Sequence, residues 1–249
     1  SAVLDANISV VLTENNMPYF TNATYYGTGY DTFEPTIGIT ASGAIFFTSW
    51  NGLGDGTHII RSRDQGLTWE DVGPFGTVDE DSGQTPNSND PYIYVDKFTD
   101  RLVKFDMHAL ASMFVEYSDD DGDTWSIPYP VEGYYVTQDH QSIASMPHPD
   151  AIVGEVVYVY CINTGSPAAG PQCSRSHTGG QTWDVQRIGY PLGTPQCSGL
   201  HGHVAGGIDQ TIYRGNPSCD GPAVYRSLDG GDTWTEHTIT TEVQMQQGW

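Results

Sequence analysis

Acidic and imidazole side chains recur at the start of four predicted strands. They occur in Glu34-Pro35, Asn89-Asp90-Pro91, Asp139-His140-Gln141 and His201-Gly202-His203. Carboxylates and imidazoles act as general acids and bases, and both bind divalent cations. A ring of such groups around one channel is therefore a candidate site for ligand binding, metal binding or catalysis.

Each chemistry uses a different part of this set. The candidates for ligand binding are Glu34, Asp90, His140, His201 and His203, and those for a metal ion are Asp90, His140 and His203. A glycosidase needs two carboxylates about 5–10 Å apart. Its candidate residues are Glu34, Asp90 and Asp139, with His140 or His203 as acid or base. The other interpretation is structural, because Asp before Pro often starts a strand and a buried His often binds a backbone carbonyl.

A second pattern places these side chains at equivalent positions. The sequence Ser-x-Asp-x-Gly-x-Thr-Trp occurs at residues 62–69, 118–125 and 227–234, and at 176–183 with Thr178 in place of Asp. The four copies, called Ser–Trp motifs below, start 56, 58 and 51 residues apart. Glu34 and Asp90 each precede the serine of the following motif by 28 residues. This period indicates repeats, and its length suits four-stranded β-propeller blades.

The chemistry of the motif residues explains a structural role. Ser and Asp accept hydrogen bonds from nearby backbone N–H groups and close a tight turn. Gly permits a positive φ where the hairpin reverses. Thr and Trp begin the next strand, and the indole is large enough to fill the gap between neighbouring blades. The residues assigned this role are Ser62, Asp64, Trp69, Ser118, Asp120, Trp125, Ser176, Trp183, Ser227, Asp229 and Trp234.

The four motifs resemble the Asp-box, or BNR, repeat of the sialidase-like β-propellers of secreted bacterial and archaeal proteins. The resemblance covers nearly the whole chain and implies one all-β propeller domain, 1–249. We expect four-stranded blades at about 34–73, 89–130, 139–190 and 199–240, with a candidate closing strand in 1–30. Members of the superfamily usually have six or more blades. The four blades are therefore expected to be part of a larger ring, in a protein that continues past the C-terminus or in an assembly, with closure of a four-bladed ring as the alternative.

The resemblance also raises sialidase activity, which in that family uses three arginines to hold the substrate carboxylate. Bidentate Arg–carboxylate pairing is what such a substrate requires. The seven arginines here are Arg61, Arg175 and Arg226 directly before a motif, Arg63 and Arg101 in turns, and Arg187 and Arg214. Phe33-Glu34-Pro35 carries Glu where the family has Arg. Too few arginines remain for a triad, so sialidase activity is not expected from these residues.

Charge and cysteines limit the partners and the location. The net charge is −22, from 31 acidic and 9 basic residues, which repels nucleic acid and anionic membranes. No apolar stretch is long enough to predict membrane insertion. The four cysteines, Cys161, Cys173, Cys197 and Cys219, permit three pairings. Cys161–Cys173 with Cys197–Cys219 is the economical one, because each pair falls within one repeat. Disulfides predict an extracellular or cell-surface location.

Three functions are compatible with these residues. The leading hypothesis is a secreted or cell-surface propeller with a binding or structural role, whose partner is a glycan, an extracellular protein or another copy of itself. The second is a sialidase-like glycoside hydrolase that acts at the central rim. The third is a propeller whose central Glu, Asp and His residues bind a divalent cation. No other cofactor is expected, and a non-enzymatic role is favoured over hydrolysis.

Overall fold

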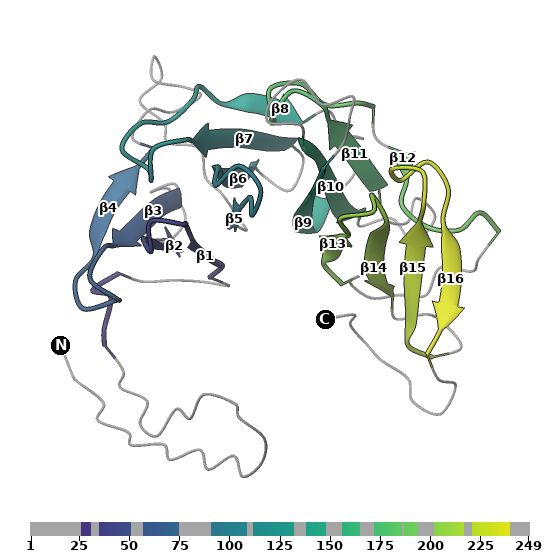
Figure 1. The fold of residues 1–249 in the computed structure, drawn as a ribbon, viewed down its shortest axis with the longest axis horizontal. Helices are drawn as coiled ribbons and strands as arrows, with labels where there is room; N and C mark the ends of the chain where they lie inside the picture. The colour runs from purple at the N-terminus through teal and green to yellow at the C-terminus, as the bar shows by residue number, and fades with distance from the viewer. Residues whose placement is uncertain are drawn as a thin grey trace, which may run out of the picture.

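The fold consists of β-sheets arranged along an arc. The computed structural model describes residues 26–30, 35–50, 57–74, 91–108, 112–131, 138–147, 156–164, 172–185, 187–193, 202–216 and 221–239. Every regular element in these ranges is a strand, and the strands form four four-stranded antiparallel sheets. The sheets, called blades 1 to 4, follow one another around an open interior (Figure 1). In these ranges we find no helix with the length and apolarity that crossing a membrane requires.

Each blade is a meander of four strands that are consecutive in sequence. Blade 1 contains β1 (Ile37–Ile39), β2 (Ile45–Trp50), β3 (Thr57–Ser62) and β4 (Glu70–Gly73). Blade 2 contains β5 (Tyr92–Val95), β6 (Leu102–His108), β7 (Ser112–Ser118) and β8 (Tyr129–Val131). Blade 3 contains β9 (Gln138–Pro147), β10 (Val156–Thr164), β11 (Gln172–Ser176) and β12 (Arg187–Ile188). Blade 4 contains β13 (Val204–Gly206), β14 (Ile212–Asn216), β15 (Ala223–Ser227) and β16 (Thr235–Thr238).

The predicted disulfide between Cys161 and Cys173 is present and joins β10 to β11, where the two residues are ladder partners. Cys197 and Cys219 lie outside the described residues. The candidate closing strand in 1–30 also falls mainly outside them, and residues 26–30 form no strand. The all-β fold with four-stranded sheets is therefore confirmed, whereas the size of the ring stays a prediction.

The serine of each Ser–Trp motif binds the backbone of its own turn. The N–H of the motif glycine donates to the Ser Oγ at 2.8, 2.8, 2.9 and 2.8 Å in the four motifs in order. Asp64 accepts the Thr68 N–H at 2.9 Å and the Thr68 hydroxyl at 2.5 Å. In the third motif the hydroxyl of Thr178 accepts the Thr182 N–H at 2.8 Å. A threonine hydroxyl thus replaces the carboxylate as the acceptor that closes this turn.

The apolar cores lie between blades. Successive residues of a strand point to opposite faces of the sheet, so a blade with neighbours on both sides buries both faces. The three cores are represented by Phe46 and Leu102 between blades 1 and 2, Phe105 and Tyr158 between blades 2 and 3, and Val159 and Ile212 between blades 3 and 4. Each blade is therefore stabilised mainly by its neighbours.

Three motif tryptophans lie in these cores, as expected of residues that fill the gaps between blades. Trp125 of blade 2 donates its indole N–H to the Val72 carbonyl of blade 1 at 2.9 Å. Trp183 of blade 3 packs against Phe105 of blade 2, with 6.4 Å between ring centroids. Trp234 of blade 4 belongs to the core shared with blade 3. In each case the motif of one blade packs on the sheet before it.

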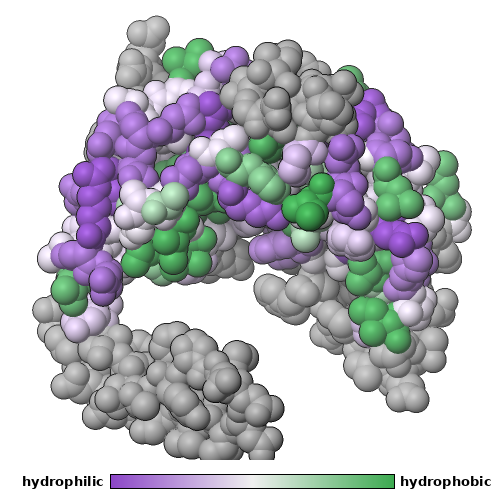
Figure 2. All heavy atoms as spheres, viewed as in Figure 1, coloured by the Kyte–Doolittle hydropathy of each residue, from purple (hydrophilic) through white to green (hydrophobic). Residues whose placement is uncertain are grey.

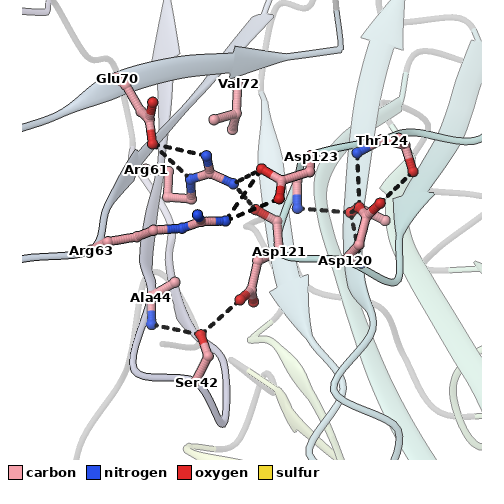
Figure 3. A network of polar contacts seen from close by, with 12 residues as sticks. Ser42, Ala44, Arg61, Arg63, Glu70, Val72, Asp120, Asp121, Asp123 and Thr124 are labelled. Carbon is pink, nitrogen blue, oxygen red and sulfur yellow. Dashed lines mark hydrogen bonds and ion pairs between the residues drawn. The ribbon is translucent and has the colours of Figure 1, made fainter.

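In blades 1 to 3, one side chain of the sheet binds the Ser–Trp motif of the following blade. Arg61, which directly precedes the first motif, donates to the Asp121 carbonyl at 2.5 Å and to Asp123 Oδ1 at 2.6 Å (Figure 3). Arg175, which precedes the third motif, forms an ion pair with Asp232 at 3.2 Å. Asp123 and Asp232 are both the sixth residue of their motif. We call the residue directly before each motif the clamp residue.

Blade 2 makes the equivalent contact with blade 3 through a tyrosine hydroxyl and a side-chain amide instead of an arginine and a carboxylate. Its clamp residue is Tyr117, and the side-chain amide of Gln181 donates to the Tyr117 hydroxyl at 2.9 Å. Gln181 is the sixth residue of the third motif. Arg101 supplies a cation nearby, since it lies 3.8 Å from the Tyr117 ring centroid and donates to the Gly179 carbonyl at 2.7 Å. The clamp residue of one blade thus binds the sixth motif residue of the next in all three described blade pairs.

The motif carboxylates make stability sensitive to acid. Hydrogen bonds from Thr68, and then from Ser62, lower the pKa of Asp64 to about 2. A carboxylate with a lowered pKa in the folded state contributes stability above its unfolded pKa, near 3.8, and loses it as the pH falls towards 2. We therefore expect Asp64→Asn to lose less of its free energy of unfolding than the wild type between pH 4.5 and 2.5. Urea unfolding at both pH values measures this.

The third motif provides the reverse variant. Thr178→Asp introduces the carboxylate that the other motifs carry, so the acid-dependent loss should become larger than in the wild type. Equal losses in the wild type and both variants would contradict the role assigned to the motif carboxylates.

Candidate functional site

The inner strands of blades 2, 3 and 4 bring aromatic and imidazole side chains together. The strand β9 contacts both β5 and β13 along the inner side of the arc (Figure 1). Tyr92 begins β5, His140 lies near the start of β9, and His203 directly precedes β13. The ring centroids of His140 and His203 are 5.2 Å apart, and those of Tyr92 and His203 are 5.7 Å apart. Residues from three repeats therefore converge at one place.

Arg214 of β14 adds a buried cation to this place. Its side chain is 1% exposed. Nη2 donates to Asn163 Oδ1 at 2.9 Å, Nε donates to the Gly202 carbonyl at 3.4 Å, and Nη1 is buried without a hydrogen-bond partner. No carboxylate of the described residues forms an ion pair with Arg214. Burial lowers the pKa of Arg214 to about 9, so the guanidinium is still charged at neutral pH.

The local backbone explains how His140 and Asn163 reach this place. The ladder between β9 and β10 shifts register between Cys161 and Asn163, and Asn163 then pairs with Asp139. His140 has a φ of 57°, a left-handed conformation that is uncommon for a residue with a side chain. A bulge of this kind redirects the side chains that follow it and is frequent beside functional sites. We call Tyr92, His140, Asn163, His203 and Arg214 the hub cluster.

The electrostatics of the hub cluster favour neutral imidazole and phenol groups beside one fixed positive charge. Desolvation, His140 and Arg214 all lower the pKa of His203. Burial raises the pKa of Tyr92 to about 12, so its hydroxyl stays protonated. Neutral imidazole and phenol groups both donate and accept hydrogen bonds. The cluster therefore presents hydrogen-bonding groups beside one buried positive charge.

Some of the predicted site residues can be placed and others cannot. His140 and His203 lie in the hub cluster, and Asp139 is next to His140 at the start of β9. Glu34, Asp90 and His201 lie outside the described residues. No group of three His, Cys, Asp or Glu side chains within the described ranges is arranged to hold a metal ion. Of the predicted metal ligands Asp90, His140 and His203, only the two histidines are among the described residues. Metal binding therefore stays a prediction.

Arg214 is not among the site residues that the sequence predicts. It is one of two arginines that lie outside the motifs and turns. The signal is the alternation of β14, because residues two apart share a face of the sheet. Arg214 shares its face with Ile212, which is 0% exposed. An arginine on an apolar strand face indicates a specific polar environment, since arginine is almost never fully buried unless it is paired.

Comparisons with known proteins identify the fold. No family model matches the chain, and no curated protein matches it. A protein of unknown function from Dyadobacter fermentans is similar with a TM-score of 0.59 and 15% identity, over 90% of this chain and 69% of that one. The Hadza microbial sialidase Hz136 has a TM-score of 0.53 and 20% identity, over 82% of this chain and 46% of that one.

A third similar structure is the GH93 α-L-arabinofuranosidase of Fusarium graminearum in complex with arabinobiose. Its TM-score is 0.55 at 15% identity, over 89% of this chain and 69% of that one. The chain thus spans less than half of the sialidase and about two thirds of the other two chains. These likenesses confirm a sialidase-like propeller fold. At such identities they show the fold alone.

The hub cluster predicts a measurable coupling between Arg214 and His203. Desolvation lowers the pKa of His203 most, and the charges of His140 and Arg214 lower it further, so Arg214→Met should raise this pKa by removing one of the three causes. An NMR pH titration of the imidazole protons measures this shift. The control is Arg226→Gln, which changes an arginine on the adjacent strand β15 outside the cluster. An unchanged pKa of His203 in Arg214→Met would show that the two groups are not neighbours.

Proposed function

We propose that the hub cluster binds a carboxylate-bearing sugar, and that the protein acts outside the cell as a glycan-binding propeller. The observation that carries this proposal is the state of Arg214. Burying a charge is costly unless the charge is paired and hydrogen-bonded. Arg214 is buried with Nη1 unpartnered and without a carboxylate among the described residues. An anionic ligand would supply the missing partner.

The other members of the cluster suit a sugar. The rings of His140, His203 and Tyr92 offer flat apolar surfaces, and their polar atoms can bind hydroxyl groups. Small-molecule sites commonly combine such apolar faces with a few fixed polar groups. Two of the similar structures are named as a sialidase and an arabinofuranosidase, which supports a sugar as the ligand class.

Location and charge are consistent with this role. The disulfide between Cys161 and Cys173 supports an oxidising, extracellular or cell-surface setting. The net charge of −22 makes nucleic acid an unfavourable partner. An acidic glycan would also be repelled at long range, but salt screens that repulsion beyond about 8 Å at physiological ionic strength. The short-range contact with Arg214 then decides whether the ligand binds.

Hydrolysis is the second candidate, because both named neighbours carry hydrolase names. Asp139 is the described carboxylate closest in sequence to His140, and a glycosidase needs a second one. Fluorogenic glycosides incubated with wild type, Asp139→Asn and His140→Ala distinguish the two functions. Turnover by the wild type that disappears in both variants would replace the binding role with catalysis.

Binding measurements test the proposed role of Arg214. A charge-assisted hydrogen bond contributes about 1.5–3 kcal/mol, which is about 10- to 100-fold in affinity. We expect calorimetry with glucuronate, galacturonate and N-acetylneuraminate to find an acidic sugar that binds the wild type, and Arg214→Gln to weaken it by about that factor. Arg226→Gln is the matched control and should bind like the wild type.

Neutral glucose and galactose show whether the carboxylate matters. The proposal predicts that they bind more weakly than the acidic sugars and that Arg214→Gln changes their affinity little. Equal affinity for acidic and neutral sugars, or acidic-sugar binding that survives in Arg214→Gln, would remove Arg214 from ligand recognition.

A further inference from the structure

Arg226 is the clamp residue of blade 4, but its guanidinium binds no residue that the structure describes. Arg61 and Arg175, at the same position in blades 1 and 3, each bind the motif of the following blade. The guanidinium of Arg226 makes no hydrogen bond or ion pair with a described residue, and its Nε is buried without a partner. Arg226 thus has the same ladder position as Arg61 and Arg175 but lacks their described partner.

The face beside Arg226 is also more exposed than the equivalent faces of the other blades. Across the ladder, the clamp residues are paired with Phe46, Val103, Val159 and Tyr213 in blades 1 to 4. The first three of these are 0% exposed, because the following blade covers them. Tyr213 is 40% exposed. Figure 2 shows hydrophobic surface over the sheet at this end of the arc. Blade 4 thus presents the same interface that blades 1 to 3 bury.

The described blade pairs match each clamp residue to the sixth residue of the next motif. Arginine meets a carboxylate at Arg61 with Asp123 and at Arg175 with Asp232. Tyrosine meets an amide at Tyr117 with Gln181. Because a largely buried guanidinium needs an opposite charge, an arginine at this place selects an acidic sixth residue.

The chain itself has no free motif of that kind. The first motif, at the other end of the arc, has Leu67 as its sixth residue, and this side chain is 56% exposed. The sixth residues of the second and fourth motifs are acidic, but Arg61 and Arg175 already bind them. If blade 4 docked on blade 1 of this chain or of a second copy, Arg226 would face an aliphatic side chain. Such an arrangement buries the guanidinium without a partner.

We propose that the outer face of blade 4 docks a further propeller blade whose Ser–Trp motif carries Asp or Glu at its sixth position, and that this blade comes from a polypeptide segment outside these 249 residues. Arg226 then binds the acidic residue and a carbonyl of the motif turn. The motif tryptophan of the incoming blade packs over Tyr213 and Val224. This inference does not depend on what the hub cluster binds.

Variants of the existing chain give the first test. Arg61→Gln and Arg175→Gln each break a described clamp, so the equilibrium constant for unfolding should rise about tenfold or more. Arg226→Gln should change it by no more than about twofold, because it removes no hydrogen bond or ion pair to a described residue. The midpoints of urea unfolding measure all three. A loss in Arg226→Gln equal to that in the other two would show that Arg226 is already paired and would overturn the proposal.

A measurement of self-association tests whether a second copy of this chain is the partner of blade 4. Sedimentation of the 249-residue chain should show a monomer across the accessible concentrations. A dimer that Arg226→Glu dissociates would identify a second copy as the partner and overturn the proposal.

An extended chain tests the proposed partner directly. A copy of residues 199–249 joined after Trp249 places a fifth motif 51 residues after the fourth, which is the spacing between the third and fourth motifs. Its sixth residue is the counterpart of Asp232. Amide hydrogen exchange of Tyr213 and Val224 should slow by about tenfold or more on extension, because docking suppresses local opening.

Two further variants of the extended chain isolate the clamp. Replacing the new aspartate by Leu, as in the first motif, should abolish most of this protection. Combining Arg226→Tyr with Gln at the sixth position, the pair found between blades 2 and 3, should restore it. Equal protection with Asp and Leu, or an extension that leaves exchange unchanged, would overturn the proposal.

Discussion

The contact between one sheet and the motif turn of the next blade is the interaction on which the rest of this structure depends. A four-stranded sheet has two faces, and here both are apolar, so a blade is not stable without neighbours. The clamp residues Arg61, Tyr117 and Arg175 fix which turn lies against which sheet. The motif tryptophans and the cores between blades follow from that placement. The hub cluster depends on it too, because its members come from three blades and no single repeat contains them.

The hub cluster is positively charged, whereas the chain as a whole is acidic. The protein carries a net charge of −22, yet the buried charge of the hub cluster is the positive charge of Arg214. Desolvation, His140 and the guanidinium all lower the pKa of His203, so the cluster presents hydrogen-bonding groups around one cation. An acidic surface favours solubility, whereas a shielded cation favours an anionic ligand. The two properties act at different distances, since salt screens the surface charge and leaves buried contacts largely unscreened.

Much of the scaffold can be predicted from the sequence, whereas less of the site can. Four Ser–Trp motifs at a regular period determine the hairpins, because each motif closes its turn with its own side chains. Equivalent positions in the repeats also bring His140 and His203 together. Comparing the repeats by their motifs does not single out Arg214, because it lies neither in a Ser–Trp motif nor among the acidic and imidazole residues before the inner strands. The pairing of Tyr117 with Gln181 depends on the packing of two blades, which no local pattern encodes. Glu34, Asp90 and His201 are predicted members of the rim that lie outside the described residues.

The most direct test of this account is a double-mutant cycle that exchanges one clamp for another. Arg61→Tyr and Asp123→Gln convert the contact between blades 1 and 2 into the Tyr–Gln pair that blades 2 and 3 use. The free energy of unfolding of both single variants and the double variant measures the coupling between the two positions. The account predicts that each single variant is destabilised and that the double variant is more stable than the sum of the two losses implies. Strictly additive losses would contradict the claim that the clamp residue and the sixth motif residue recognise each other.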